Sequence, residues 1–186
     1  QLLRATQSLN ADSMTGMVQH PFIDVGPTSW LYNYVTVAYN RGYLFYLNGT
    51  TPTNFNPNAP ISRAQFVELA CRVFGISNNG PVNTQYTDVL PGYWGSSYIT
   101  QATAAGWING YGDGRFGPDD TLTRAQLVTI INRATGRHAD PSFLNANIGR
   151  LNTFSDVGPS HWAYYDILEA ANTHTFSSQG GREVWG

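Results

Sequence analysis

The sequence predicts a mainly α-helical protein made of tandem helix-loop-helix repeats, and three observations favour this fold class. A nine-residue motif occurs three times, at 22–30, 86–94 and 154–162, with the pattern aromatic, any residue, Asp, Val, any residue, Pro, two residues, Trp. Helix-like segments follow the motif copies. Two of the copies are then followed by a second motif that has the form of a helix N-terminus.

Each copy of the first motif predicts a loop that runs into a helix. Its proline suits a helix entrance, where the missing N–H costs nothing. Gly42 and Gly106 stand twelve residues beyond Trp30 and Trp94, and glycine suits the left-handed position that ends a helix. In the third copy His174 stands at this place, which marks that copy as a departure from the pattern.

The second motif is a Phe-Xaa-Pro turn followed by Ser/Thr-Arg-Ala-Gln, and it occurs at 55–65 and 116–126. Its Ser or Thr and its Gln have the form of a capping box, in which each side chain accepts a free N–H at the start of the helix. This places Arg63 and Arg124 at helix N-termini. Apolar residues at helical spacing follow both arginines, so each repeat is predicted to be helix, loop, helix.

Arg63 and Arg124 stand where the helix dipole favours anions over cations. A guanidinium beside free backbone N–H groups makes a cradle for a carboxylate or a phosphate. The alternative is structural, because each arginine could pair with a nearby Asp of the first motif and pin its repeat. The sequence leaves both interpretations open, and the two can coexist.

The three motif tryptophans, Trp30, Trp94 and Trp162, also have two interpretations. Indole is large enough to anchor a core while presenting its N–H to a partner. We expect most of each side chain to lie in the core, with an edge left exposed. Such an edge beside polar side chains would suit a sugar ring.

The composition excludes several functional classes. The chain has 186 residues and a net charge of −2, and its ten basic residues are all Arg and scattered singly, which argues against nucleic acid as a partner. No apolar run approaches the roughly 18 residues of a membrane span. Cys71 is the single cysteine, so neither an intramolecular disulfide nor a zinc cluster can form, and we expect a structural thiol.

Metal binding has little support in the sequence. The four histidines show no metal-ligand spacing and are expected to face solvent. The loop 109–120 is similar to a calcium-binding loop, but Tyr111 fills a ligand position and Asp120 replaces the final Glu. A Gly-rich turn is therefore expected, and neither a metal nor a cofactor is predicted.

With these motifs in view, the sequence resembles the S-layer homology domain of bacterial cell-surface proteins over most of 21–162. The resemblance implies three tandem repeats in a pseudo-threefold, three-pronged helical fold. It implies noncovalent attachment to secondary cell-wall polysaccharide, often pyruvylated, at the cell wall or cell surface, with no membrane insertion. It also implies that the polysaccharide is bound by Arg63, Arg124, Asp24, Asp88, Asp156, Trp30, Trp94, Trp162 and Gly112.

The sequence departs from the family's pattern in several places. Gln65 and Gln126 replace the Glu of the family's Thr-Arg-Ala-Glu motif, which keeps the capping box but removes a negative charge. The third copy is followed, at 175–186, by neither the loop nor the Arg-bearing motif. The stretch 4–7, Arg-Ala-Thr-Gln, resembles the end of an Arg-bearing helix at 133–136.

The expected organisation is thus the tail of a preceding repeat and a linker at 1–20, repeats at 21–80 and 81–140, and a linker with the front half of a further repeat at 141–186. Three explanations are open: a fragment of a longer protein, a circularly permuted three-repeat unit, or half-repeats that neighbouring subunits complete. The third explanation implies a head-to-tail contact that would generate a filament or lattice.

Two functional hypotheses follow from different classes. The first is a noncatalytic cell-surface module that binds an acidic wall polysaccharide. The second is a structural subunit of an extracellular filament or S-layer lattice, a homo-oligomer in which the arginines only pin the repeats. A glycan-processing enzyme would need paired carboxylates across a cleft, and the adjacent Asp119 and Asp120 are better explained by a turn and a helix cap.

Overall fold

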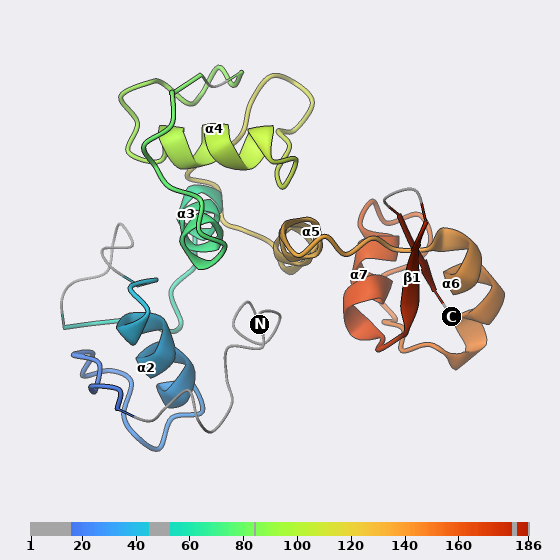
Figure 1. The fold of residues 1–186 in the computed structure, drawn as a ribbon, viewed down its shortest axis with the longest axis horizontal. Helices are drawn as coiled ribbons and strands as arrows, with labels where there is room; N and C mark the ends of the chain where they lie inside the picture. Colours follow the sequence, from blue (N-terminus) through green and yellow to red (C-terminus); the bar gives the residue numbers. More distant parts are fainter. Residues whose placement is uncertain (1–15, 45–52, 84, 180–181, 186) are drawn as a thin grey trace. The chain divides into compact units, whose positions relative to one another are not determined.

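The structure is a computed structural model that describes residues 16–44, 53–83, 85–179 and 182–185 (Figure 1). Its described part is mainly helical, as the sequence predicts. The arginine-bearing stretch at 4–7 lies outside the described residues. The elements are α2 (Tyr32–Asn40), α3 (Arg63–Val73), α4 (Ser96–Ala104), α5 (Arg124–Ala134), α6 (Pro141–Asn147), the 3₁₀ turn η2 (Ile148–Arg150), α7 (Tyr164–Ala171), β1 (Phe176–Gln179) and β2 (Arg182–Trp185).

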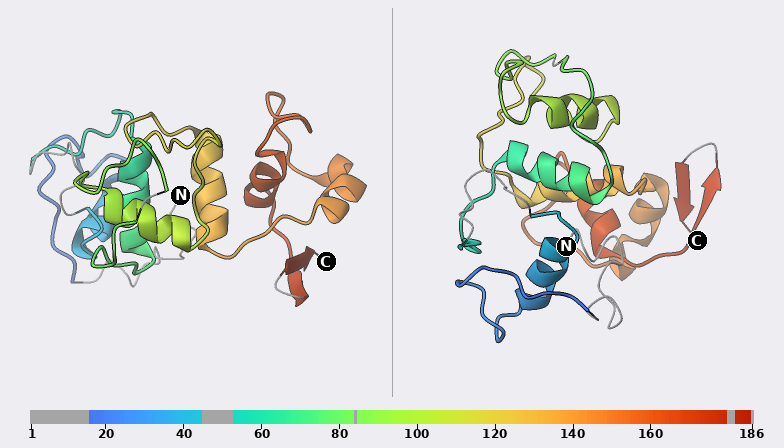
Figure 2. Two further views of the ribbon diagram at one scale, coloured as in Figure 1. Left: turned by 90° about the horizontal axis from the view of Figure 1, so that it is seen from above. Right: turned by 60° about the vertical axis from the view of Figure 1, so that its left-hand side comes forward.

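The chain divides into two compact units, 1–122 and 123–186. In the first unit α3 packs against α4, and these two helices lie side by side in both views of Figure 2. In the second unit α5 packs against α7, and α6 also contacts α7. Each helix pair therefore joins the second helix of one repeat to the first helix of the next. Consecutive repeats supply each other's packing partner, as in other tandem-repeat proteins.

The structure confirms the local sequence signals for where helices begin and end. Gly42 and Gly106 follow α2 and α4 with φ of 71° and 74°, in the left-handed region that favours glycine. Both predicted capping boxes are present, with Ser62 and Thr123 accepting the N–H of the glutamine three residues later. These contacts explain why α3 and α5 begin at their arginines.

The third motif copy ends its helix in a different way. Asn172, which follows α7, is extended, with φ −120° and ψ 129°. The chain continues past His174 into an antiparallel hairpin, in which Phe176 pairs with Trp185. Because Asn172 is extended, α7 is not followed by the turn that follows α2 and α4. In the order of the chain, the hairpin takes the place of the glycine-rich or proline-rich loop of the other repeats.

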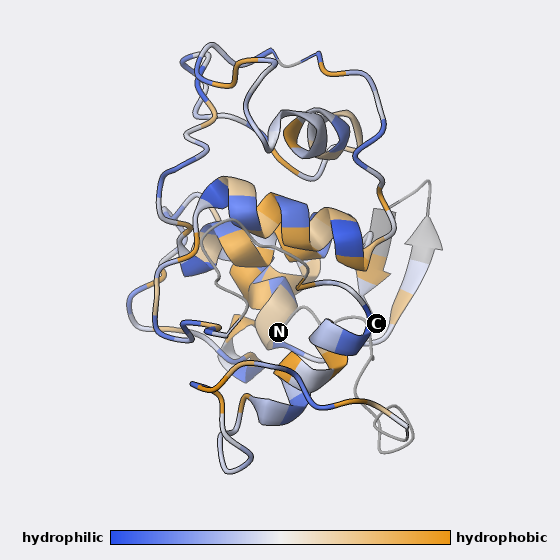
Figure 3. Cartoon of the chain, turned by 90° about the vertical axis from the view of Figure 1, so that its left-hand side faces the viewer, coloured by the Kyte–Doolittle hydropathy of each residue, from blue (hydrophilic) through white to orange (hydrophobic). Residues whose placement is uncertain are grey.

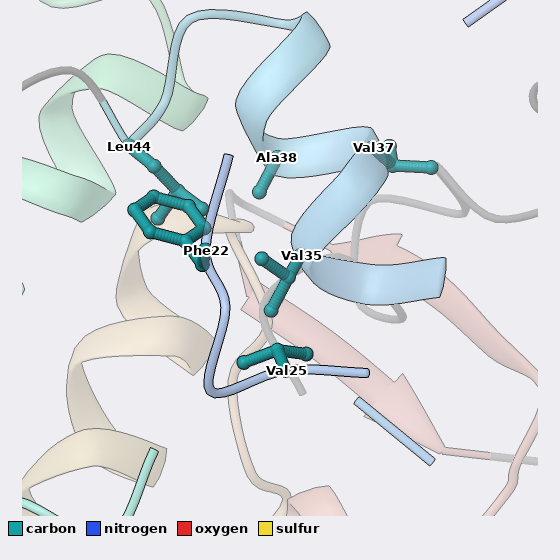
Figure 4. Packing of buried hydrophobic residues seen from close by; sticks show 6 residues of the cluster. All are labelled: Phe22, Val25, Val35, Val37, Ala38 and Leu44. Atoms are coloured by element: carbon teal, nitrogen blue, oxygen red, sulfur yellow. The ribbon is translucent and has the colours of Figure 1, made fainter. Parts of the chain in front are cut away.

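Each unit has its own apolar core. The helices in Figure 3 carry both hydrophobic and hydrophilic residues, as expected for helices with one buried side. In the first unit a cluster is formed by residues of α2 and of the segments next to it (Figure 4), and it is made of Phe22, Val25, Val35, Val37, Ala38 and Leu44. In the second unit the buried cluster is made of Leu144, Tyr164, Leu168 and Trp185. Among the described residues, no helix has the length and apolar character needed to cross a membrane.

The expectation that all histidines face solvent is wrong for two of them. His20 is buried, and its Nδ1 accepts the N–H of Phe22 at 3.2 Å. His174 stacks on the Trp185 indole at 3.4 Å between ring centroids, and its Nε2 lies 3.6 Å from a Glu169 carboxylate oxygen. Both rings are enclosed by side chains that come together only in the folded chain.

Candidate functional site

The motif Asp holds the Phe-Xaa-Pro turn of its own repeat. The two Asp88 carboxylate oxygens accept the N–H groups of Phe116 and Gly117, each at 2.8 Å. Asp24 accepts the N–H groups of Phe55 and Asn56 at 2.8 Å and 2.7 Å. A carboxylate that accepts two adjacent N–H groups fixes the turn, and this explains why one motif is followed by the other.

The middle residue of each turn has a left-handed backbone. Asn56 has φ 57° and the equivalent Gly117 has φ 69°. Asparagine and glycine are the residues that adopt this conformation most readily. The same turn geometry therefore forms in both repeats in spite of the different residue.

The turn contacts also change the acidity of Asp88. Desolvation raises the pKa of this carboxyl, but the bonds from Phe116 and Gly117 oppose it and the net effect is a pKa below the usual range. The ionised form is therefore the one that the folded protein stabilises.

Arg63 is buried beneath the loop of the next repeat. Its Nε donates to the Phe116 carbonyl at 2.8 Å and its Nη2 to the Asn109 carbonyl at 3.3 Å. The guanidinium carbon lies 4.7 Å from the centroid of the Tyr111 ring and 4.5 Å from that of Phe116. The residue is 5% exposed. Arg63 thus pins α3 to the loop at 109–117, as the structural interpretation expects, but through carbonyls and aromatic rings instead of the Asp88 carboxylate.

The first turn of α3 has no N–H group left for a ligand. Arg63 N–H donates to the Asp120 carbonyl at 3.0 Å and Ala64 N–H to the Pro118 carbonyl at 2.9 Å. Gln65 N–H donates to the Ser62 hydroxyl at 3.2 Å. The anion cradle that the sequence allows at this helix is therefore filled by the protein itself.

Arg124 has a different environment, although it stands at the same place in its motif. Its side chain is exposed. The capping box of Thr123 and Gln126 closes the start of α5, as in α3. In the described part of the second unit, no loop covers this helix end in the way that 109–120 covers α3. Of the two motif arginines, Arg124 is the one whose charge is accessible to a ligand.

The loop 109–120 is a Gly-rich turn, as expected. Gly112 and Gly114 have φ of 85° and 87°. Asp113 forms an ion pair with Arg115 at 2.9 Å, and the Tyr111 hydroxyl donates to Asp120 at 2.9 Å. These carboxylates are engaged within the loop. Over the described residues, no group of three His, Cys, Asp or Glu side chains is arranged to hold a metal ion.

Two of the three motif tryptophans are more exposed than the sequence suggests. Trp30 and Trp162 are 77% and 62% exposed, so the expectation that most of each indole is covered is wrong for these two, whereas Trp94 is 38% exposed and keeps most of its surface covered, as expected. Each lies in the turn before its helix, and two of the three motif valines, Val25 and Val89, are buried at 2% exposed.

Each exposed indole has an aromatic neighbour. Tyr34 lies 6.2 Å from Trp30 between ring centroids, Tyr93 lies 5.3 Å from Trp94, and His161 lies 5.9 Å from Trp162. Tyr93 is an addition to the predicted site. Its hydroxyl donates to Asp119 at 2.8 Å, which places a carboxylate beside the aromatic pair. Sequence comparison of the copies offers only a weak signal for Tyr93, since Ser29 and His161 stand at its place in the other two.

Cys71 is buried in α3, and its thiol lies 3.8 Å from the Tyr98 carbonyl. Burial, with a smaller contribution from Glu68, raises the pKa of the thiol to about 12. Because the thiolate is the reactive form, we expect iodoacetamide to leave the folded protein unmodified at neutral pH and to alkylate it in urea. Mass spectrometry of timed samples checks this, and rapid alkylation without denaturant would contradict the buried position.

Comparison with known proteins assigns the family. The family model of the S-layer homology domain matches residues 21–67 and 85–128, which contain two copies of the paired motifs. The chain belongs to the S-layer homology family. Its two matched segments are therefore modules of a cell-surface protein, and the family assigns the chain to the cell surface.

Three relatives carry names from cell-surface biology. The chain is 30% identical over 196 residues to cell surface glycoprotein 1 of Acetivibrio thermocellus, covering 98% of the chain and 8% of the relative. It is 34% identical over 161 residues to the cellulosome-anchoring protein of the same organism, covering 84% of the chain and 33% of the relative. It is 33% identical over 86 residues to the surface layer protein of Brevibacillus choshinensis, covering 45% of the chain and 8% of the relative. The chain thus spans a third or less of the length of these proteins.

Proposed function

We propose that this chain is a noncatalytic module that anchors a surface protein to an anionic, often pyruvylated, secondary cell-wall polysaccharide. The family supports the cell-surface role, and one of the relatives is named a cellulosome-anchoring protein. The observation that carries the proposal is the exposure of an indole, with an aromatic neighbour, at the same position of all three motif copies.

The exposed indoles supply flat apolar surfaces on which the rings of a polymer can stack. A sugar ring presents C–H groups on its faces and hydroxyls at its edge, so an aromatic face with a nearby polar group suits it. In the second copy Trp94 and Tyr93 form the surface, and the Asp119 carboxylate beside them can accept a hydrogen bond from a sugar hydroxyl. Repetition of such surfaces along the chain would bind a repeating polymer with avidity.

In this proposal Arg124 is the residue that binds the negative charge of the polysaccharide. An anionic ketal needs a cation that it can reach, and the Arg63 guanidinium is buried against Tyr111 and Phe116. Arg124 is exposed at the start of α5 and can bind a carboxylate with two parallel hydrogen bonds. Asp24 and Asp88 serve the fold by holding their turns, and Gly112 shapes the loop above Arg63.

The three-pronged, pseudo-threefold arrangement of the family is part of this proposal. It is supported by the way in which helices pair: α3 with α4 and α5 with α7, each across a repeat boundary. Such pairing makes every repeat depend on the next, and a closed set of three would give equivalent prongs.

The proposal predicts that replacing all three motif tryptophans by alanine weakens wall binding at least about tenfold, or about 1.4 kcal/mol. Cosedimentation with isolated cell walls, before and after extraction of their secondary polysaccharide, measures this. The matched control is Leu90→Ala, since Leu90 is an exposed apolar residue of the same motif, 69% exposed. Equal binding by the triple variant, or binding that survives extraction of the polysaccharide, would refute the proposal.

A further inference from the structure

The aromatic pair of the second motif copy is held against a carboxylate. The rings of Tyr93 and Trp94 lie 5.3 Å apart between centroids, and the Tyr93 hydroxyl donates to Asp119 Oδ1 at 2.8 Å. All three residues belong to the first unit. Their side chains therefore form one surface, here called the second-copy surface.

The Tyr93 hydroxyl has already used its proton. It carries a single hydrogen, and that hydrogen is donated to Asp119. Burial is the main cause that raises the pKa of Tyr93, the bond to Asp119 raises it further, and a hydrogen bond from the Trp94 side chain acts in the opposite direction. The hydroxyl thus stays protonated at neutral pH and points its proton at the carboxylate, not at a ligand.

Asp119 can accept a further hydrogen bond. Its side chain is exposed, and Tyr93 donates to one of its two oxygens. An ionised carboxylate offers about four acceptor positions and no proton. It attracts hydroxyl and amide hydrogens, whereas it repels a second carboxylate placed beside it.

The first motif copy differs at both of these positions. Ser29 stands at the place of Tyr93, and its hydroxyl accepts the N–H of Leu31 at 3.2 Å. Asn58 stands at the place of Asp119, three residues after the phenylalanine of the turn. The charged pair of Tyr93 and Asp119 therefore distinguishes the second copy from the first.

We propose that the second-copy surface binds a non-acidic sugar unit of the wall polysaccharide and discriminates against an acidic one. This inference rests on the proposed function. The ring of the sugar stacks on Trp94 and Tyr93, and one of its hydroxyl or amide hydrogens is donated to Asp119. The acidic unit needs a different contact, which the proposed function assigns to Arg124. The chain thus binds two kinds of sugar unit at different residues.

Two glycosides that differ by one carboxylate test the inference without cell walls. Methyl glucoside and methyl glucuronide are titrated onto the full chain with Trp30→Ala and Trp162→Ala, which leaves Trp94 as the motif indole. Saturation-transfer NMR with irradiation of aromatic protons reports contact. We expect methyl glucoside to bind about threefold or more tightly than methyl glucuronide at low salt, with a smaller difference as salt is added.

Three further changes in this background identify the residues responsible. Asp119→Asn should bind both glycosides alike, because the amide keeps an acceptor oxygen and loses the charge. Trp94→Ala should reduce transfer to methyl glucoside at least about fivefold, since it removes the stacking face. Tyr93→Phe keeps the ring and releases Asp119, so we expect an intermediate effect.

Asn58→Ala is the matched control, because Asn58 is exposed at the corresponding position of the first copy. It should leave the binding of both glycosides unchanged. Absence of transfer to methyl glucoside, equal or tighter binding of methyl glucuronide, or a preference that survives Asp119→Asn would each overturn the inference.

This inference and the anchoring proposal fail separately. Wall binding that depends on the tryptophans, with no preference between the glycosides, would remove the role of the second-copy surface alone. A preference for methyl glucoside that Asp119→Asn abolishes, in a chain that does not bind cell walls, would remove the anchoring proposal alone.

Discussion

Arg63→Ala is expected to lower the free energy of unfolding by about 3 kcal/mol. The variant loses a charge-assisted bond to the Phe116 carbonyl, a second bond to the Asn109 carbonyl, and the contacts of a cation with two aromatic rings. It also leaves the Phe116 carbonyl without this donor in a buried place. Urea unfolding followed by circular dichroism measures the effect.

Arg124→Ala is the matched control, because it removes the same residue from the same motif position. Arg124 is exposed, so we expect its replacement to change stability by less than about 0.5 kcal/mol. Arg63→Lys should recover less than half of the loss, since an ammonium cannot stack as a guanidinium does. Equal stability of the two alanine variants would show that the loop at 109–117 does not depend on Arg63.

Asp88→Asn is expected to lower the free energy of unfolding at neutral pH by about 2 kcal/mol. The carboxylate accepts two backbone N–H groups, and an amide offers one oxygen acceptor while its NH₂ group faces the second donor. The measurement is again urea unfolding, with Asp156→Asn as the control at the exposed counterpart.

The same pair of proteins gives a test by pH. The folded-state pKa of Asp88 lies below its usual value, so its contribution is complete above the unfolded pKa of about 3.9 and is lost as the pH falls through the folded pKa. The stability difference between the unchanged chain and Asp88→Asn should therefore be constant from about pH 5 to 7 and shrink below about pH 4. A difference that stays constant down to pH 2 would contradict the assignment.

These effects bear on how wall binding is interpreted. A variant of Arg63 or Asp88 is expected to weaken polysaccharide binding by loosening the loop that lies beside Tyr93 and Trp94. Loss of binding in such a variant would thus not identify a ligand contact. The variants of Trp30 and Trp162 are sharper tests, since these two indoles are mostly exposed and contribute little to a core.

Several features follow from the sequence because they depend on neighbours along the chain. The capping boxes need only Ser62 or Thr123 and a glutamine three residues later. The ends of α2 and α4 need only a glycine that can adopt a positive φ. The repeat itself is visible as identical spacing, and it was sufficient to suggest the S-layer homology family that the comparisons confirm.

Other features were decided by the tertiary structure, because they depend on which distant segments meet. The sequence left Arg63 as either an anion ligand or a partner of the motif Asp, and the fold places the loop of the next repeat over it. Asp88 then binds backbone N–H groups 28 and 29 residues away. Trp30 and Trp162 are mostly exposed, and in the first copy the motif residue that is buried in the core is Val25. The residue type sets which contacts a side chain can make, but long-range packing decides which partner it meets. Arg63 and Arg124 therefore share a motif position and differ in their surroundings, one buried and the other exposed.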